Sequence, residues 1–123
     1  MAIEFRIDDR ELEDGTPVVA VSGEVDLFTA PDLKRHVERA LDEHSGRLVV
    51  DLTDTTFIDS SSLGVLIGAH RRLAEHDTPL VVVTENQSVR KTLRITGLDG
   101  LFTVVGSVTD VAGTGDDAEP ATA

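Results

Sequence analysis

The sequence contains no cysteine and few aromatic residues, and both shortages exclude classes of function. Without cysteine there are no disulfide bonds, no thiolate nucleophile and no cysteine-rich zinc site. The four aromatic residues are all phenylalanines, too few to build the stacking platform of a single-strand nucleic-acid binder. The function must therefore come from other side chains.

Positive charge is also scarce, because 11 Lys and Arg face 23 Asp and Glu for a net charge of -12. Nucleic-acid-binding proteins present cations to phosphates, so we expect no nucleic-acid partner. No apolar run approaches the length that crosses a bilayer, and the first residues lack the basic-then-apolar layout of a signal peptide. We expect a cytoplasmic protein without a membrane partner, whose acidity keeps it soluble or suits a basic protein partner.

The apolar periodicity predicts a single α/β domain over residues 1–112. Alternation at 3–7 and a run from Pro17 indicate two strands joined by a turn at 13–16. Helical spacing follows from Thr29, again after the serines, and once more from 86 to 97. Apolar runs predict the remaining strands, at 48–52, 78–84 and 101–105. The order is β-β-α-β-α-β-α-β with an optional short final helix, which implies a mixed sheet covered by helices.

The last residues, 113–123, are small, acidic and poor in apolar side chains. Such a segment cannot bury enough apolar surface to offset the entropy of ordering it. We predict that this segment is a disordered acidic tail outside the domain.

The stretch DSSSLG, residues 59–64, places an aspartate and three serines where the second helix begins. Asp59 or Ser60 can cap that helix by accepting hydrogen bonds from its free N–H groups, a role without function. Alternatively, Ser60 is phosphorylated, since free N–H groups and the helix dipole favour a phosphate there. One cap residue suffices, so capping does not explain three hydroxyls. Beyond them, Gly64 and Gly68 lie one turn apart and predict close approach to another element.

Enzyme-like interpretations of this stretch fail on missing partners. Ser60 is not part of a G-x-S-x-G elbow, and none of the four histidines has a pattern that indicates a catalytic triad or a metal site. A phospho-accepting receiver domain would need a lysine after its last strand, yet the only lysines are Lys34 and Lys91 on predicted helices. We therefore expect no catalytic residue, no metal and no cofactor.

A second unusual stretch, SGEVDLFTAPDL, joins the strand from Pro17 to the first helix. Thr29 is a good N-cap with Pro31 in the first turn, which lets Phe28 staple onto Leu33. Leu27 has no such structural role in a loop and is a candidate interface contact. Asp26 is expected to be an exposed acid between strand and helix.

Together the two stretches, SGEVDLFTAPDL and VVDLTDTTFIDSSSLGVLIGAHRRL, resemble the anti-sigma factor antagonists, the stand-alone STAS domains of the SpoIIAA and RsbV type. The resemblance covers about residues 3 to 112, with both motifs in order. It implies a phosphoacceptor at the first serine after the aspartate, which is Ser60, with Ser61 and Ser62 as secondary candidates. It implies partner contacts at five residues: Asp26, Leu27, Asp59, Ser60 and Ser61.

The family's partners follow from the same resemblance. The unphosphorylated antagonist binds an anti-sigma factor, a serine kinase with a histidine-kinase-like ATPase fold, and thereby frees the sigma factor. Phosphorylation by that kinase breaks the contact, and a PP2C-type phosphatase restores it. The chain is then a substrate and a switch rather than an enzyme, and the nucleotide belongs to the partner. We expect a monomer.

One residue departs from the family pattern. The family has glycine in DSSGLG, where this chain has Ser62. That side chain is expected either to crowd the kinase or to point to solvent. A different function also stays open, in which the STAS domain is a scaffold or ligand-sensing module without a phospho-switch.

Overall fold

The computed structural model describes residues 4–44 and 46–113, which form one five-stranded sheet packed against helices. In chain order the elements are β1 (Arg6–Glu11), β2 (Pro17–Val25), α1 (Ala30–Glu43), β3 (Leu48–Ile58), α2 (Ser60–Ala74), β4 (Leu80–Val83), α3 (Gln87–Ile95), η1 (Leu98–Gly100), β5 (Thr103–Val105) and η2 (Val108–Gly113). This order confirms the α/β fold predicted from the periodicity. The short 3₁₀ helix η1 was not predicted.

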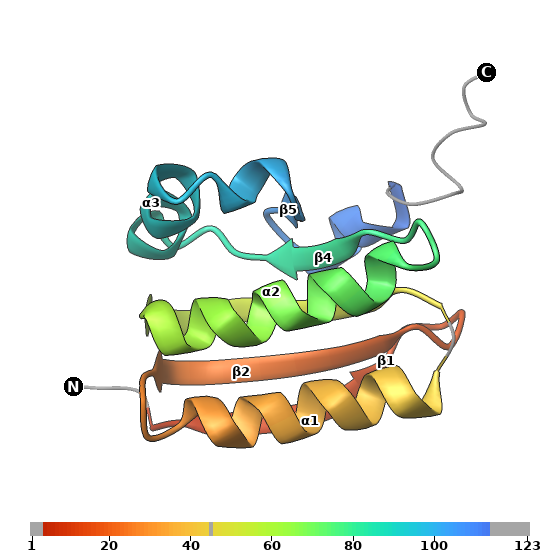
Figure 1. Ribbon diagram of the computed structural model, residues 1–123, viewed down its shortest axis with the longest axis horizontal. Coiled ribbons are helices and arrows are strands. Elements are labelled where there is room, and N and C mark those ends of the chain that lie inside the picture. Colours follow the sequence, from red (N-terminus) through yellow and green to blue (C-terminus); the bar gives the residue numbers. More distant parts are fainter. Residues whose placement is uncertain (1–3, 45, 114–123) are drawn as a thin grey trace.

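The strands lie in sequence order across the sheet, β1-β2-β3-β4-β5. β1 and β2 form an antiparallel hairpin, and each later pair is parallel. Parallel neighbours need a crossover, which α1, α2 and α3 provide in turn. All three helices therefore begin at the same end of the molecule, where the parallel strands finish, at the left of Figure 1.

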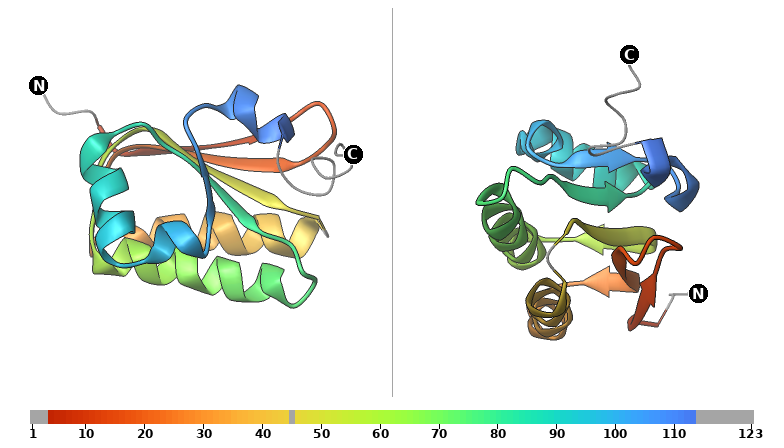
Figure 2. Two further views of the ribbon diagram at one scale, coloured as in Figure 1. Left: turned by 90° about the horizontal axis from the view of Figure 1, so that it is seen from above. Right: turned by 90° about the vertical axis from the view of Figure 1, so that its right-hand side faces the viewer.

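The main core lies between the sheet and the crossover helices. α1 and α2 run side by side along one face (Figure 2). Leu33 and Val37 of α1 are buried there against alternate residues of β2, including Val19 and Val21. Burying a branched aliphatic side chain contributes about 1.5–3 kcal/mol, so this layer is a large source of stability. The layer fixes the two helices next to each other.

The opposite face of the sheet is covered at one end by η2. Val111 of η2 is fully buried against Val18, Val49, Val81 and Val83. This explains the unbroken apolar runs of β3 and β4, whose side chains are buried on both faces. η2 is the short final helix that the sequence predicted.

Four strands differ from the expected boundaries. β4 and β5 are shorter than their predicted runs, and two other strands differ more. β1 begins at Arg6 rather than at residue 3, and β3 continues beyond 52 to Ile58. The polar end of β3 stays in the sheet because it pairs with the long β2, with irregularities in register. The buried Thr55 hydroxyl also donates a hydrogen bond to the Val21 carbonyl oxygen at 2.9 Å. The apolar pattern did not predict this extension because most of its side chains are polar.

The predicted tail, 113–123, lies outside the described residues except for Gly113, where η2 ends. Within the described part of the chain, the helices are too short or too polar to span a membrane.

Candidate functional site

Two helix starts lie next to each other where β2 and β3 end. Val25 and Ile58, the last residues of these strands, are paired in the parallel register. Each strand is followed directly by an aspartate, which is Asp26 before α1 and Asp59 before α2. The sheet register therefore brings together the two stretches that the sequence singled out, 33 residues apart.

Asp26 organises the loop that leads into α1. Its carboxylate oxygen Oδ1 accepts hydrogen bonds from the N–H groups of Phe28 (2.9 Å) and Thr29 (3.1 Å). Its own N–H donates to the Thr29 hydroxyl at 2.9 Å, and its carbonyl oxygen accepts from Ala30 at 2.8 Å. The expectation of a freely exposed acid is thus wrong, because Asp26 is half-buried and holds the loop. Thr29 precedes α1 without capping it through its side chain.

Leu27 and Phe28 project from this fixed loop into solvent. Leu27 is 67% exposed and Phe28 is 86% exposed. The predicted staple of Phe28 onto Leu33 is therefore absent, since a stapled ring would be covered. Two adjacent apolar side chains held in solvent by a hydrogen-bonded turn have no role in the core. They form an apolar surface beside the start of α2.

Asp59 caps α2. Its Oδ1 accepts hydrogen bonds from the N–H groups of Ser61 (2.9 Å) and Ser62 (3.2 Å). The Ser62 hydroxyl in turn accepts one from the Asp59 N–H at 3.2 Å, which completes a reciprocal capping box. Of the two capping residues considered from sequence, the structure assigns the role to Asp59. Ser60 is left as the first residue of the helix.

The three serines occupy three different environments. Ser60 is exposed, and its hydroxyl forms no hydrogen bond within the described residues. Ser61 is half-buried and faces α1. Ser62 is 1% exposed, and its hydroxyl donates to the Val25 carbonyl oxygen at 2.8 Å. Ser60 is the one hydroxyl of the three that is freely accessible to an incoming enzyme.

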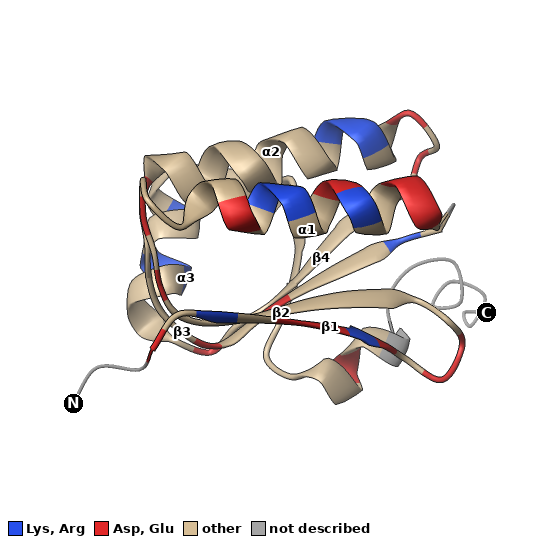
Figure 3. Cartoon of the chain, turned by 90° about the horizontal axis from the view of Figure 1, so that it is seen from below, with Lys and Arg blue, Asp and Glu red and all other residues tan. Residues whose placement is uncertain are grey.

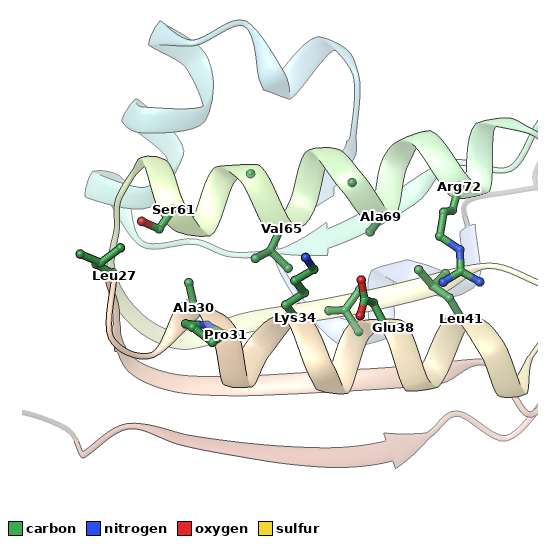
Figure 4. Close-up of a pocket in the computed structure, with 13 residues that line it drawn as sticks. Leu27, Ala30, Pro31, Lys34, Glu38, Leu41, Ser61, Val65, Ala69 and Arg72 are labelled. Atoms are coloured by element: carbon green, nitrogen blue, oxygen red, sulfur yellow. The ribbon is translucent and has the colours of Figure 1, made fainter.

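An open groove of about 620 Å³ runs between α1 and α2 from the loop (Figure 4). Leu27 and Ser61 border its start, and Arg72 borders its far end. Gly64 and Gly68 lie along it, and a Cβ added at either glycine would have no neighbour within 4 Å. The predicted close approach of another element to these glycines is therefore wrong. They widen the groove instead.

The STAS domain family model matches residues 9–111 of the chain. The chain belongs to the STAS domain family. It is 31% identical over 86 residues to the anti-sigma-B factor antagonist of Listeria monocytogenes, a match that covers 70% of this chain and 75% of the relative. Proteins of this kind are regulatory binding proteins, so this STAS domain is not an enzyme.

Solved structures agree with this assignment. An anti-sigma factor antagonist from Mycobacterium paratuberculosis superposes with a TM-score of 0.80 and 28% identity, covering 87% of this chain and 90% of its own. The unphosphorylated anti-sigma factor antagonist SpoIIAA has a TM-score of 0.71 with 18% identity, covering 89% of this chain and 94% of its own. At 18% identity, the likeness to SpoIIAA shows only that the two proteins share a fold.

Ser62, where the resemblance implies glycine, has a structural role in this STAS domain. Its buried hydroxyl links the cap of α2 to the end of β2, so it does not point to solvent. The expectation of a solvent-facing side chain was wrong because the hydrogen bond is made to Val25, which lies 37 positions earlier in the sequence. The same burial disfavours Ser62 as a phosphoacceptor.

The histidines of this STAS domain lie elsewhere. His36 and His44 of the α1 region contact Asp9 and Glu11 of β1, and the His70 ring packs against Phe102. Among the described residues there is no group of three or more His, Asp or Glu side chains placed to hold a metal ion.

Replacing Ser62 with alanine is expected to lower the free energy of unfolding by about 1–2 kcal/mol. The change removes one half of the capping box and leaves the buried Val25 carbonyl oxygen without this donor. Urea denaturation followed by circular dichroism measures the loss. Ser60→Ala is the matched control and should stay within about 0.5 kcal/mol of wild type, since its hydroxyl is exposed. Equal losses for both variants would contradict these separate roles.

Replacing Asp26 tests whether it acts through hydrogen bonds or through charge. Asp26→Ala should destabilise the fold by about 1–2 kcal/mol because two N–H groups and a hydroxyl lose their acceptor. Asp26→Asn keeps an acceptor oxygen and should recover most of that stability. Thermal and urea unfolding of the two variants decide the question. If asparagine behaves like alanine, the carboxylate charge matters more than the turn that we describe.

Proposed function

We propose that this STAS domain is an anti-sigma factor antagonist whose binding is switched by phosphorylation of Ser60. One observation carries the proposal. The exposed Ser60 hydroxyl has no hydrogen bond in the described structure and lies at the start of α2, next to Ser61, which borders the same groove as the exposed Leu27. A kinase can reach this hydroxyl, and a partner that covers Leu27 and Phe28 would also cover Ser60.

Phosphorylation would act through surface charge. The N–H groups of Ser61 and Ser62 are already bonded to Asp59, and that of Leu63 to the Asp59 carbonyl oxygen. A phosphate on Ser60 therefore finds fewer free donors than the sequence suggested and stays at the surface. It adds about two negative charges beside the Asp59 carboxylate. The fold is left unchanged while the docking surface becomes repulsive.

The groove between α1 and α2 gives this contact its apolar part. Its start at Leu27 and Ser61 adjoins Ser60, and its walls include Val65 and Leu41. An aliphatic side chain of the partner fits such a groove, since Gly64 and Gly68 leave it open. We assign partner contact to the residues predicted from sequence, which are Asp26, Leu27, Asp59, Ser60 and Ser61. Asp26 and Asp59 contribute chiefly by holding the loop and the helix start.

The partner in this proposal is an anti-sigma factor that is also a serine kinase with a histidine-kinase-like ATPase fold. A PP2C-type phosphatase would return phosphorylated Ser60 to its binding-competent form. The relatives from Listeria and Mycobacterium are named as antagonists of anti-sigma factors, and SpoIIAA of Bacillus has been solved in a phosphorylated form. In this proposal the antagonist is a cytoplasmic monomer. Residues 1–112 form its STAS domain.

Partner capture tests the proposal. Tagged Ser60→Ala and Ser60→Asp chains serve as baits in lysate of the host, and bound proteins are identified by mass spectrometry. A protein with a kinase-type ATPase domain that is enriched on the alanine bait and lost from the aspartate bait supports the switch. Retention of the same proteins by both baits favours the scaffold or ligand-sensing alternative.

A further inference from the structure

α3 carries positive charge that no carboxylate among the described residues neutralises through an ion pair. In the described part of the chain, six of the eleven Lys and Arg side chains form ion pairs with carboxylates: Arg6, Arg10, Arg35, Arg39, Arg47 and Arg72. Of the other five, three lie on α3, at Arg90, Lys91 and Arg94. α3 has no acidic residue, in a chain with twice as many acids as bases (Figure 3).

The arrangement of α3 directs this charge outward. Val89 and Leu93 are buried in the core, so the opposite side of the helix faces solvent. Lys91 and Arg94 are exposed on that side, one turn apart. Arg90 is half-buried, and its Nε donates to the Thr84 carbonyl oxygen at 2.9 Å. The exposed acids Glu85 and Asp99 flank the helix, yet neither pairs with these cations in the described structure.

An apolar side chain interrupts the cationic side. Ile95 is 71% exposed next to Arg94. Leu101, shortly after η1, is 49% exposed. Cations mixed with exposed aliphatic side chains fit a protein segment that offers both carboxylates and an apolar residue. A phosphate chain or nucleic acid would use the cations alone, and the net charge of -12 opposes its approach.

This surface lies at the same end of the molecule as the proposed docking site. α3 and the start of α2 are both at the left in Figure 1 and again at the left in Figure 3. A stable interface buries roughly 800 Å² on each partner, which is more than Ser60, Leu27 and Phe28 provide by themselves. A partner centred on Ser60 therefore extends beyond the loop, and α3 is one neighbouring surface at that end.

We propose that Lys91, Arg94 and Ile95 form a second docking surface that binds an acidic segment of the anti-sigma factor partner. This inference rests on the proposed function for the identity of the partner. The two contacts have different roles. The Ser60 region carries the switch, whereas the α3 surface speeds encounter and sets the salt dependence of binding by attraction at the rim.

The test is calorimetric titration of the anti-sigma factor captured by the Ser60→Ala chain with three variants of the full chain. The double variant Lys91→Gln/Arg94→Gln lowers the net charge by two, and so does the control Arg71→Glu. Arg71 is exposed, unpaired in the described structure and near the far end of α2. Ser60→Asp reports on the switch. Circular dichroism confirms that each variant is folded.

We expect the double variant to weaken binding about tenfold at low salt, with the loss shrinking as salt rises, because ionic screening removes rim attraction. Arg71→Glu should stay within about twofold of wild type. The proposed α3 surface is overturned if the double variant binds the anti-sigma factor with wild-type affinity. It is also overturned if Arg71→Glu loses as much affinity as the double variant. If Ser60→Asp abolishes binding in that case, the switch still stands. If Ser60→Asp binds normally while the double variant does not, the switch falls and the α3 surface stands.

Discussion

Ser60→Asp is expected to weaken binding to the anti-sigma factor about a hundredfold or more and to leave the fold intact. The contact would bury the new carboxylate beside Leu27 and Phe28 without a cationic partner, and an unpaired charge in an interface costs at least about 3 kcal/mol. Ser60 is exposed in the free protein, and a negative charge in the first turn of a helix is favourable. The free energy of unfolding should therefore change by less than about 0.5 kcal/mol.

Titration calorimetry and urea denaturation separate these two effects. Ser60→Ala should keep both wild-type affinity and wild-type stability. Arg71→Glu, a larger charge change on the same helix, controls for the general effect of added negative charge. A loss of stability above about 1 kcal/mol in Ser60→Asp would point back to a capping role, and unchanged affinity would remove the basis for the switch.

Replacing both Gly64 and Gly68 with alanine is expected to raise the stability of the fold and to weaken binding to the anti-sigma factor. Both glycines lie within α2, and an added Cβ would have no neighbour within 4 Å. Alanine raises helix stability by about 0.5–1 kcal/mol at each position, so the double variant should gain about 1–2 kcal/mol. The same methyl groups narrow the groove, and affinity for the anti-sigma factor should fall about tenfold.

The single variants locate the effect within the groove. Gly64→Ala lies nearer Ser61 and should weaken binding more than Gly68→Ala, which lies one turn further on. Arg71→Ala, on the same helix but outside the groove lining, should leave affinity unchanged. Destabilisation by either alanine would mean that another element approaches α2 closely after all. Higher stability with full affinity would exclude the groove from the docking surface.

The fold could be predicted from local signals because those signals and the tertiary structure agree. The apolar runs of β3 and β4 are buried on both faces, and α3 begins at Gln87, within the stretch of helical spacing expected from 86 to 97. The end of β3 was missed because Thr55 and its polar neighbours belong to a strand through pairing with β2. An apolar pattern carries no information about such pairing.

For the candidate site, the sequence indicated which two segments to consider but not the structural roles of their residues. The two motifs marked the β2–α1 loop and the start of α2, which the register joins. However, Asp26 and Ser62 act through hydrogen bonds whose geometry the sequence does not contain, one within a turn and one across 37 positions. The cations of α3, which form no ion pair in the described structure, were missed for the same reason, since composition counts charges without showing which of them are neutralised.

The most direct test of the switch is to map the phosphate itself. The full chain is incubated with the captured anti-sigma factor and ATP, and the modified residue is identified by tandem mass spectrometry. The exposure of Ser60, the half-burial of Ser61 and the burial of Ser62 predict phosphate on Ser60 alone, and none on the Ser60→Ala chain. Phosphate on Ser61 or Ser62 of the wild-type chain, or no transfer at all, would contradict the account.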